Sequence, residues 1–321
     1  MPLEPVRPIT LAEIKEAQKR IAGTIQRTPL VKLQLGKGYP EIHLKLENLQ
    51  PINAYKLRGA ANAVALLSDE ERKRGVWTIS AGNAGQGVAY AARQAGVPCT
   101  VVVIETAPEA KKARMEALGA KLVAVPFDIA WKAMEDRSFN GVEGTFVHPF
   151  DDHNFITGNA SVGLEILEDL PNVTAVLGAI GGGGLVTGLA SAIKAVKPDV
   201  KVYGVEPETA APAALSHRAG SAQEFKDWQY SFIDGAGGKS VFPRMWDRMK
   251  DIVDAYSVVS LNEVRAAMRI MAEKARVISE GAGALSVAAA MRGDAGQGPV
   301  VAIVSGGNID LGKFCELIAD R

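Results

Sequence analysis

Four consecutive glycines form the strongest local feature of the chain. Gly181–Gly184 follow the apolar run AVLGAI and precede the amphipathic stretch LVTGLASAIKAV. A strand that runs into glycines and then into a helix leaves backbone N–H groups free at a helix N-terminus, which suits a phosphate. A hinge or a tight turn would need the same residues. The segment lacks the spaced glycines of a dinucleotide site and the Lys and Ser/Thr of a nucleotide P-loop, so a ligand with one phosphate fits better.

Two further glycine-rich segments could bind a ligand. In ISAGNAGQG, residues 79–87, Ser80 and Asn83 can donate and accept hydrogen bonds, and the adjacent amides could hold a carboxylate. Taken alone, the segment is more commonly explained by either side chain capping the following helix. In IVSGGNIDLG, residues 303–312, Ser305 ends an apolar strand. Ligands bind at such strand ends in open parallel sheets.

Lys56 is the candidate nucleophile. It opens KLRGAANAVALL, in which Leu57, Ala60 and Val64 follow one helical face. A lysine at such a buried edge loses its proton readily and can attack a carbonyl. By position alone, a solvated surface lysine is the more common explanation.

The elements expected around these segments are those of an α/β fold with open, mostly parallel sheets flanked by helices. Thr10 and Glu13 form a capping-box pattern before an N-terminal helix. The polar stretch 151–159 reads as a linker between two strand-and-helix blocks. Apolar strand-like runs cover residues 42–46, 76–80, 100–104, 121–125, 175–180, 202–205 and 299–304.

Composition narrows the class of partner. Lys plus Arg and Asp plus Glu both total 36 of 321 residues, so no net charge favours nucleic acid or an anionic membrane. We expect a small-molecule partner and no membrane span. Cys99 and Cys315 each lie in an apolar stretch, which indicates buried thiols in a reducing compartment such as the cytoplasm.

Six motifs together resemble the tryptophan-synthase β-like, or fold-type II, family of pyridoxal-5′-phosphate (PLP) enzymes, especially its threonine/serine dehydratase branch. They are LKLENLQPINAYKLRGA, ISAGNAGQGVAYAAR, GAIGGGGLVTGL, GVEPE, ISEGAGA and VSGGNID. They occur in the family's order and at compatible spacings from about Ile21 to the C-terminus. The resemblance implies a homodimer of two-domain subunits. Residues 1–52 plus 152–321 would form a large PLP-binding domain, and residues 53–151 a small mobile domain.

The resemblance also assigns roles. Lys56 would carry the cofactor, Asn83 would contact its ring hydroxyl, and a neutral Ser305 would face its pyridine nitrogen. Such a serine would favour prompt loss of a β-leaving group over transamination. The implied cofactor residues are Lys56, Asn83, Gly181, Gly182, Gly183, Gly184, Leu185, Gly235, Glu280 and Ser305; the implied substrate residues are Ser80, Ala81, Gly82, Asn83 and Ala84.

The reaction implied is α,β-elimination from a β-hydroxy amino acid, which yields a 2-keto acid and ammonia. Racemisation is the weaker alternative, because Ala81 replaces the proton-exchanging serine of related racemases. β-Replacement and a non-catalytic PLP- or amino-acid-binding regulatory protein remain open alternatives. No regulatory domain is expected after Arg321.

Two departures from the family pattern concern specificity and metal. Ala84 stands where dehydratases carry histidine, and Asn53, Ala54 and Tyr55 replace glycine, serine and phenylalanine. The lost volume suggests a β-substituent larger than methyl, with L-threo-3-phenylserine as the leading bulky substrate. Metal-dependent relatives use a Glu, a backbone carbonyl and an Asp; the last of these positions holds a proline (Glu206, Ala210 and Pro212), so no metal is expected.

Overall fold

Two open sheets organise the chain. The computed structural model describes residues 5–319. The larger sheet has the strand order β1-β2-β10-β7-β8-β9 and the smaller one β5-β4-β3-β6. All neighbouring strands are parallel except the edge pair β1–β2. The strands are β1 (Leu30–Lys32), β2 (Ile42–Lys45), β3 (Val76–Ile79), β4 (Cys99–Ile104), β5 (Lys121–Val125), β6 (Thr145–Phe146), β7 (Ala175–Ala179), β8 (Lys201–Pro207), β9 (Ala255–Val259) and β10 (Val300–Ile303).

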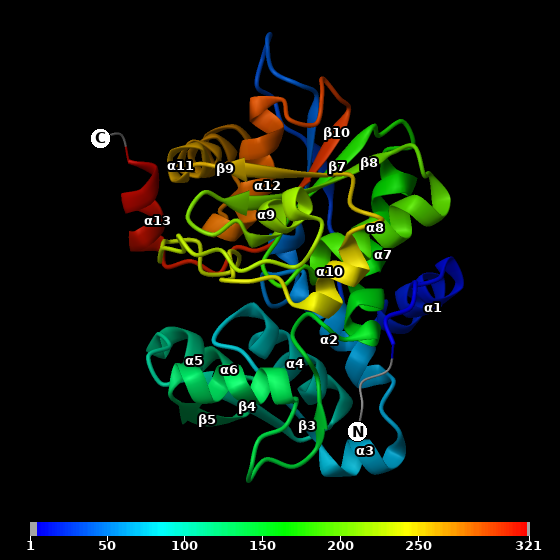
Figure 1. Ribbon diagram of the computed structural model, residues 1–321, viewed down its shortest axis with the longest axis vertical. Helices are drawn as coiled ribbons and strands as arrows, with labels where there is room; N and C mark the ends of the chain where they lie inside the picture. The colour runs from blue at the N-terminus through cyan, green and yellow to red at the C-terminus, as the bar shows by residue number, and fades with distance from the viewer. Residues whose placement is uncertain (1–4, 320–321) are drawn as a thin grey trace.

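Helices cover both faces of each sheet, so the α/β class expected from the sequence is confirmed (Figure 1). The helices are α1 (Leu11–Ile21), α2 (Lys56–Ala65), α3 (Asp69–Arg74), α4 (Asn83–Ala95), α5 (Glu109–Ala117), α6 (Phe127–Asp136), α7 (His153–Asp169), α8 (Gly184–Val196), α9 (Pro212–Ala219), α10 (Pro243–Met249), α11 (Leu261–Ile270), α12 (Gly281–Arg292) and α13 (Leu311–Ile318), with short helical turns η1 (Glu47–Leu49) and η2 (Met271–Ala275).

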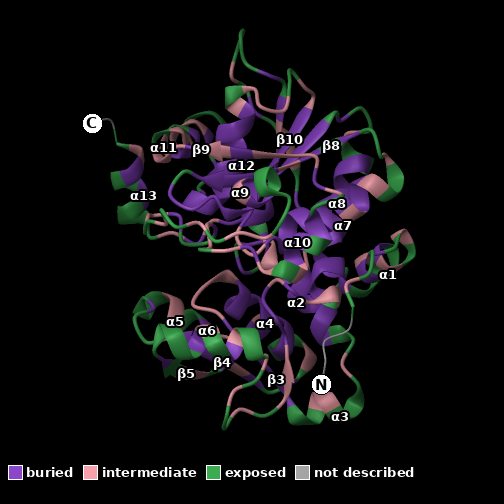
Figure 2. Cartoon of the chain, viewed as in Figure 1, coloured by how far each residue is buried: buried purple, intermediate pink, exposed green. Residues whose placement is uncertain are grey.

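Separate apolar cores lie on the two faces of the larger sheet (Figure 2). α11, α12 and α13 pack on one face against side chains such as Leu44 and Leu177. α7 and α8 pack on the other face against Val176 and Val202. Because adjacent strand residues point to opposite faces, a sheet covered on both sides reads as a continuous apolar run, and VVAI in β10 is buried throughout.

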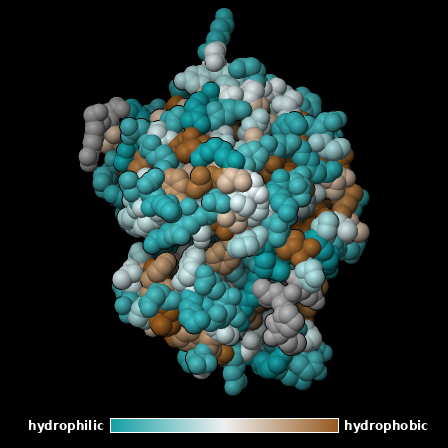
Figure 3. Space-filling view, in the orientation of Figure 1, coloured by the Kyte–Doolittle hydropathy of each residue, from teal (hydrophilic) through white to brown (hydrophobic). Residues whose placement is uncertain are grey.

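The smaller sheet lies in a separate part of the molecule, shown in the lower half of Figure 1. α2 and α4 pack on one of its faces and α6 on the other. The space-filling view shows a surface crevice between this part and the part that holds the larger sheet (Figure 3).

Most predicted elements agree with the structure, and the Thr10–Glu13 capping box is present. The predicted linker 151–159 is wrong. Asp152 accepts a hydrogen bond from the Phe155 backbone and caps α7, so His153 already lies in a helix. Polar residues there serve a helix N-terminus rather than a flexible connection.

The expectation of two buried thiols is half wrong. Cys99 is buried in β4, whereas Cys315 is exposed on α13. α13 presents only one face to the core, so an apolar helical stretch places some of its residues outward. Within residues 5–319, no helix combines the length and apolar character that crossing a bilayer requires.

Candidate active site

Lys56 is the first residue of helix α2 and is partly buried. Its Nζ atom donates a hydrogen bond to the carbonyl oxygen of Pro149 at 2.6 Å. Burial of the amine lowers its pKa to about 8. Lys45 provides the contrast: it is fully buried, and its Nζ lies 2.6 Å from a carboxylate oxygen of Glu165. Among the described residues, Lys56 has no such acidic partner, which leaves its amine free to become neutral.

The glycine loop approaches the same segment. Helix α8 begins at Gly184 without a side-chain cap, after Gly183 with φ +89°. A Cβ atom on Gly182 would lie 2.2 Å from Cγ of Phe150, and one on Gly184 would lie 3.1 Å from the Phe150 carbonyl oxygen. Glycine is therefore required for this close approach, and the first amides of α8 are available to an anion.

Helix α4 begins at Asn83 and also lacks a side-chain cap. Ser80 Oγ instead accepts a hydrogen bond from the Gly82 backbone at 3.1 Å. Ser80, Ala81, Gly82 and Asn83 remain partly exposed, whereas Ala84 is buried. The alternative in which Ser80 or Asn83 caps this helix is thus wrong, and the free amides fit a carboxylate.

Asn83 connects α4 to the larger sheet. Its Nδ2 donates to Glu280 Oε1 at 2.7 Å, and its Oδ1 accepts from Asn308 Nδ2 at 2.8 Å. Burial, followed by the nearby Asp234 carboxylate, raises the pKa of Glu280 to about 7. Asn83 is therefore held by a carboxyl group that can change its protonation near neutral pH.

Backbone contacts place the remaining predicted positions next to these segments. The Tyr55 amide donates to the Ser305 carbonyl at 3.0 Å, and Ser305 itself is buried. A Cβ atom on Gly235 would lie 3.2 Å from Glu280 Oε1, and one on Gly181 would lie 3.2 Å from the Gly235 carbonyl oxygen. Leu185 is buried in the first turn of α8. The structure therefore gathers the residues chosen from six distant segments.

Several contacting residues were not found from the sequence. Asn308 lies three positions after Ser305 and also accepts a hydrogen bond from Arg114 Nη1 at 2.7 Å. Pro149 contributes a backbone oxygen and Phe150 a ring over the glycine loop. Asn308 lies within the VSGGNID motif and could have been chosen. A backbone carbonyl and an arginine on the polar face of α5 carry no distinguishing sequence signal.

Backbone amides hold the carboxylate of Glu206. Its two carboxylate oxygens accept hydrogen bonds from the Ala213 and Ala214 amides at 2.9 and 2.7 Å, at the start of α9. Burial raises its pKa to about 7. In the part of the chain that the structure describes, no group of three or more His, Cys, Asp or Glu side chains is placed to hold a metal ion.

Comparison with known proteins identifies the family. The profile described as "Pyridoxal-phosphate dependent enzyme" matches residues 21–306. An L-threonine ammonia-lyase from Thermotoga maritima is 41% identical over 317 residues, which cover 97% of this chain and 78% of that protein. A serine racemase structure from Dictyostelium discoideum has a TM-score of 0.85 and 32% identity, over 94% of this chain and 99% of that one. A threonine deaminase structure from T.th. has a TM-score of 0.82 and 34% identity over the same shares.

The chain belongs to the pyridoxal-phosphate-dependent enzyme family, as the motifs indicated. The residues present fit this cofactor. A part-buried amine with a lowered pKa, hydrogen-bonded to a carbonyl and facing the Tyr55 and Phe155 rings, suits attachment of an aldehyde. An uncapped helix N-terminus behind a glycine turn suits a phosphate.

Proposed function

We propose that this protein is a PLP-dependent ammonia-lyase that converts a β-hydroxy amino acid of the L-threonine or L-serine type to a 2-keto acid and ammonia. The observation that carries the proposal is the Lys56 amine, with its pKa lowered to about 8, between two uncapped helix N-termini. Similarity to a threonine ammonia-lyase and to a threonine deaminase supports the choice of substrate class.

Lys56 acts as the general base. A neutral amine can accept the proton from the substrate Cα, and the Pro149 carbonyl oxygen orients the amine by accepting one of its hydrogens. When bound, PLP supplies an electron sink for the electron pair left at Cα. The lowered pKa keeps a useful fraction of the amine neutral near physiological pH.

The N-terminus of α4 binds the substrate carboxylate. Its free amides and positive dipole end attract an anion, and the Ser80 hydroxyl lies at the same turn. The N-terminus of α8 and residues Gly181–Gly184 would hold the cofactor phosphate, and Asn83 and Ser305 would contact its ring. The hydrogen bond that Asn83 donates to Glu280 and the one that it accepts from Asn308 fix the orientation of that amide.

Elimination is preferred over racemisation because Ala81 offers only a methyl group at the turn that begins α4. A racemase needs a second group that returns a proton to the opposite face of Cα. β-Replacement and a silent binding protein share the fold, and fold alone does not separate them.

Product analysis separates elimination from racemisation and from silent binding. The holoenzyme is incubated with L-threonine and L-serine, and keto acid, ammonia and the opposite enantiomer are measured. We expect equal amounts of keto acid and ammonia, with none from the Lys56→Ala variant and full yield from Lys132→Ala, which changes an exposed lysine. Formation of enantiomer alone would support a racemase, and no turnover of any kind would support a binding protein.

The larger substrate L-threo-3-phenylserine belongs in the same assay. Ala54 has no exposed surface and Ala84 is 4% exposed, so neither methyl group faces a wide opening. We therefore place threonine and serine first. A kcat/KM for phenylserine above that for threonine would reverse this order, because specificity is the ratio of these constants.

The proposal extends to the domain organisation and the oligomeric state. Residues 53–151 form a small mobile domain that closes over residues 1–52 and 152–321, and the enzyme works as a cytoplasmic homodimer. Light scattering of the purified holoenzyme tests the dimer: a mass near twice 33.9 kDa is expected, and a monomer mass would contradict it.

A further inference from the structure

A chain of polar side chains joins the small-sheet part of the molecule to the large-sheet part. Arg114 Nη1 on α5 donates a hydrogen bond to Asn308 Oδ1 at 2.7 Å. Asn308 Nδ2 donates to Asn83 Oδ1 on α4 at 2.8 Å, and Asn83 Nδ2 donates to Glu280 Oε1 at 2.7 Å. We call these side chains, Arg114, Asn308, Asn83 and Glu280, the amide relay. Its hydrogen bonds all run in one direction, from an arginine to a carboxyl group.

The Asn308 amide, in the middle of the relay, is 8% exposed and fully bonded. Its second Nδ2 hydrogen is donated to the Ile52 carbonyl at 2.8 Å, and its Oδ1 also accepts from Asn53 Nδ2 at 3.4 Å. Turning this amide over would place its oxygen against the Asn83 and Ile52 oxygens. It would also place its NH₂ group against the Arg114 guanidinium. Buried polar atoms would then lack partners, so the amide has one favoured orientation.

The two ends of the relay differ in how firmly they fix its direction. A guanidinium group has N–H donors and no acceptor, so the Asn308 atom that faces Arg114 must be the oxygen. Burial, followed by the Asp234 carboxylate, raises the pKa of Glu280 to about 7. A protonated carboxyl group can donate as well as accept. Arg114 is therefore the end that keeps the same direction whatever the charge of Glu280.

The direction of the relay decides which atom Asn83 offers to a ligand. Its Oδ1 is taken by Asn308, and its Nδ2 has one hydrogen for Glu280 and a second hydrogen for a ligand. Asn83 begins α4 without capping it. A reversed relay would offer an oxygen at the same place, and that oxygen would repel the ring hydroxyl oxygen of PLP.

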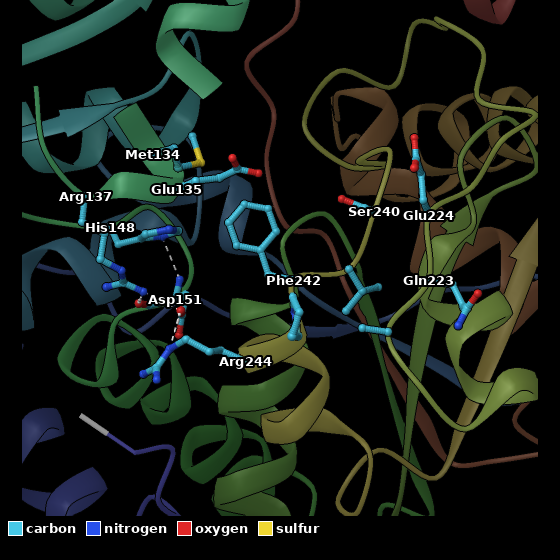
Figure 4. A pocket seen from close by; sticks show the side chains of 13 residues that line it. Met134, Glu135, Arg137, His148, Asp151, Gln223, Glu224, Ser240, Phe242 and Arg244 are labelled. Atoms are coloured by element: carbon cyan, nitrogen blue, oxygen red, sulfur yellow. Dashed lines mark hydrogen bonds and ion pairs between the residues drawn. The ribbon is translucent and has the colours of Figure 1, made fainter. Parts of the chain in front are cut away.

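Other contacts also join the two parts of the molecule. Arg137, at the end of α6, binds the Asp151 carboxylate, which Arg244 on α10 also binds at 3.0 Å (Figure 4). Lys111 on α5 forms an ion pair with Asp234. These residues do not belong to the relay, so their contacts can still hold the parts together when the relay is changed.

We propose that Arg114 is a positioning residue of the active site, which acts through Asn308 to set the direction of the amide relay, so that Asn83 presents an N–H group to the cofactor ring. Arg114 itself is exposed on α5. The inference rests on the proposed function, in which Asn83 contacts the cofactor. Its test uses cofactor binding as well as turnover, so it does not depend on which reaction follows.

The experiment measures PLP affinity by fluorescence titration, and the visible circular dichroism of the bound cofactor, which depends on how the protein holds the ring. Arg114→Met removes the donor at the end of the relay. The Kd for PLP should rise about three- to tenfold, and the dichroism band should weaken. Arg114→Lys retains a charged donor and should restore most of both signals. With L-threonine, kcat of Arg114→Met should fall by a similar factor, whereas KM should change less than about twofold.

Asn308→Asp separates the relay from a simple tether. A carboxylate at this position keeps the bond to Arg114 but offers Asn83 an acceptor in place of a donor, so the Kd for PLP should rise about tenfold or more. Arg93→Met is the matched control. Arg93 is exposed on α4 and donates to the Ala117 carbonyl at 3.1 Å, within the small-sheet part. This variant should bind PLP as the unmodified chain does.

Thermal unfolding checks that each variant is folded. Unchanged affinity and dichroism in Arg114→Met, normal PLP binding by Asn308→Asp, or equal effects of Arg93→Met and Arg114→Met would overturn the proposal. If the unmodified holoenzyme releases no keto acid or ammonia, the proposed function fails, and the titration and dichroism still decide the role of Arg114.

Discussion

The pH dependence of cofactor capture tests the chemical character of Lys56. With a pKa of about 8, about one tenth of the amine is neutral at pH 7, whereas an ordinary lysine with a pKa of about 10.4 is about 0.04% neutral. Lys56 in the apoenzyme should therefore react with PLP about 250-fold faster than an ordinary lysine of equal intrinsic reactivity. Below pH 8 its rate should rise about tenfold per pH unit, and above pH 8 it should level off.

Stopped-flow absorbance between pH 6 and pH 10 measures this rate. Nα-acetyl-L-lysine amide is the reference amine, and the ratio of the two rates removes the ionisation of PLP itself. The reference rate should continue to rise beyond pH 9. If the apoenzyme rate also levels off only near pH 10, burial does not lower the pKa of Lys56, and the reasoning for a neutral amine is refuted.

Three further substitutions test the cofactor loop, the buried ion pairs and the helix-capping carboxylate. Gly182→Leu should raise the Kd for PLP about tenfold or more, measured by fluorescence titration, whereas Gly23→Ala, whose Cβ meets no neighbour within 4 Å, should leave it unchanged. Arg58→Met removes a fully buried partner of two glutamates and should cost about 3–5 kcal/mol in urea unfolding; Lys19→Met, in an exposed pair, should cost under about 1 kcal/mol. Burial raises the pKa of Glu206 to about 7, so its protonated form stabilises the fold below about pH 4.5, and this stabilisation is lost as the pH rises to about 7. Between pH 5 and pH 7.5, the free energy of unfolding of Glu206→Gln should therefore increase by up to about 3 kcal/mol relative to that of the unmodified chain. Equal loss of PLP affinity in both glycine variants would contradict the role of the glycine loop. Equal costs for Arg58→Met and Lys19→Met would contradict the importance of the buried ion pairs. A stability difference for Glu206→Gln that does not change with pH would contradict the raised pKa of Glu206.

The parallel strands could be read from the sequence because burial on both faces gives continuous apolar runs. The predicted run 299–304 contains β10, which is buried throughout. β1 and β6 were missed, since three and two residues are too few to show a period. β9 was missed as well. This edge strand is only partly buried, and the five residues AYSVV are too few to distinguish a strand period from a helical one.

The site was accessible to sequence reasoning where backbone geometry demands a particular residue. The glycines at 182 and 184 are needed because Phe150 packs directly on them, and Lys56 occupies the first position of its helix. Contacts made by backbone atoms were not accessible, as the Pro149 carbonyl shows. The stretch 151–159 was misread because the same polar residues serve loops and helix caps, and Asp152 is a cap.

The central claim is that Lys56 carries the cofactor. Borohydride reduction of the holoenzyme, followed by proteolysis and peptide mass spectrometry, tests it most directly. The account predicts a pyridoxyl group on Lys56 in stoichiometric amount. A pyridoxyl group on Lys45, Lys111 or any other lysine, with Lys56 unmodified, would contradict it.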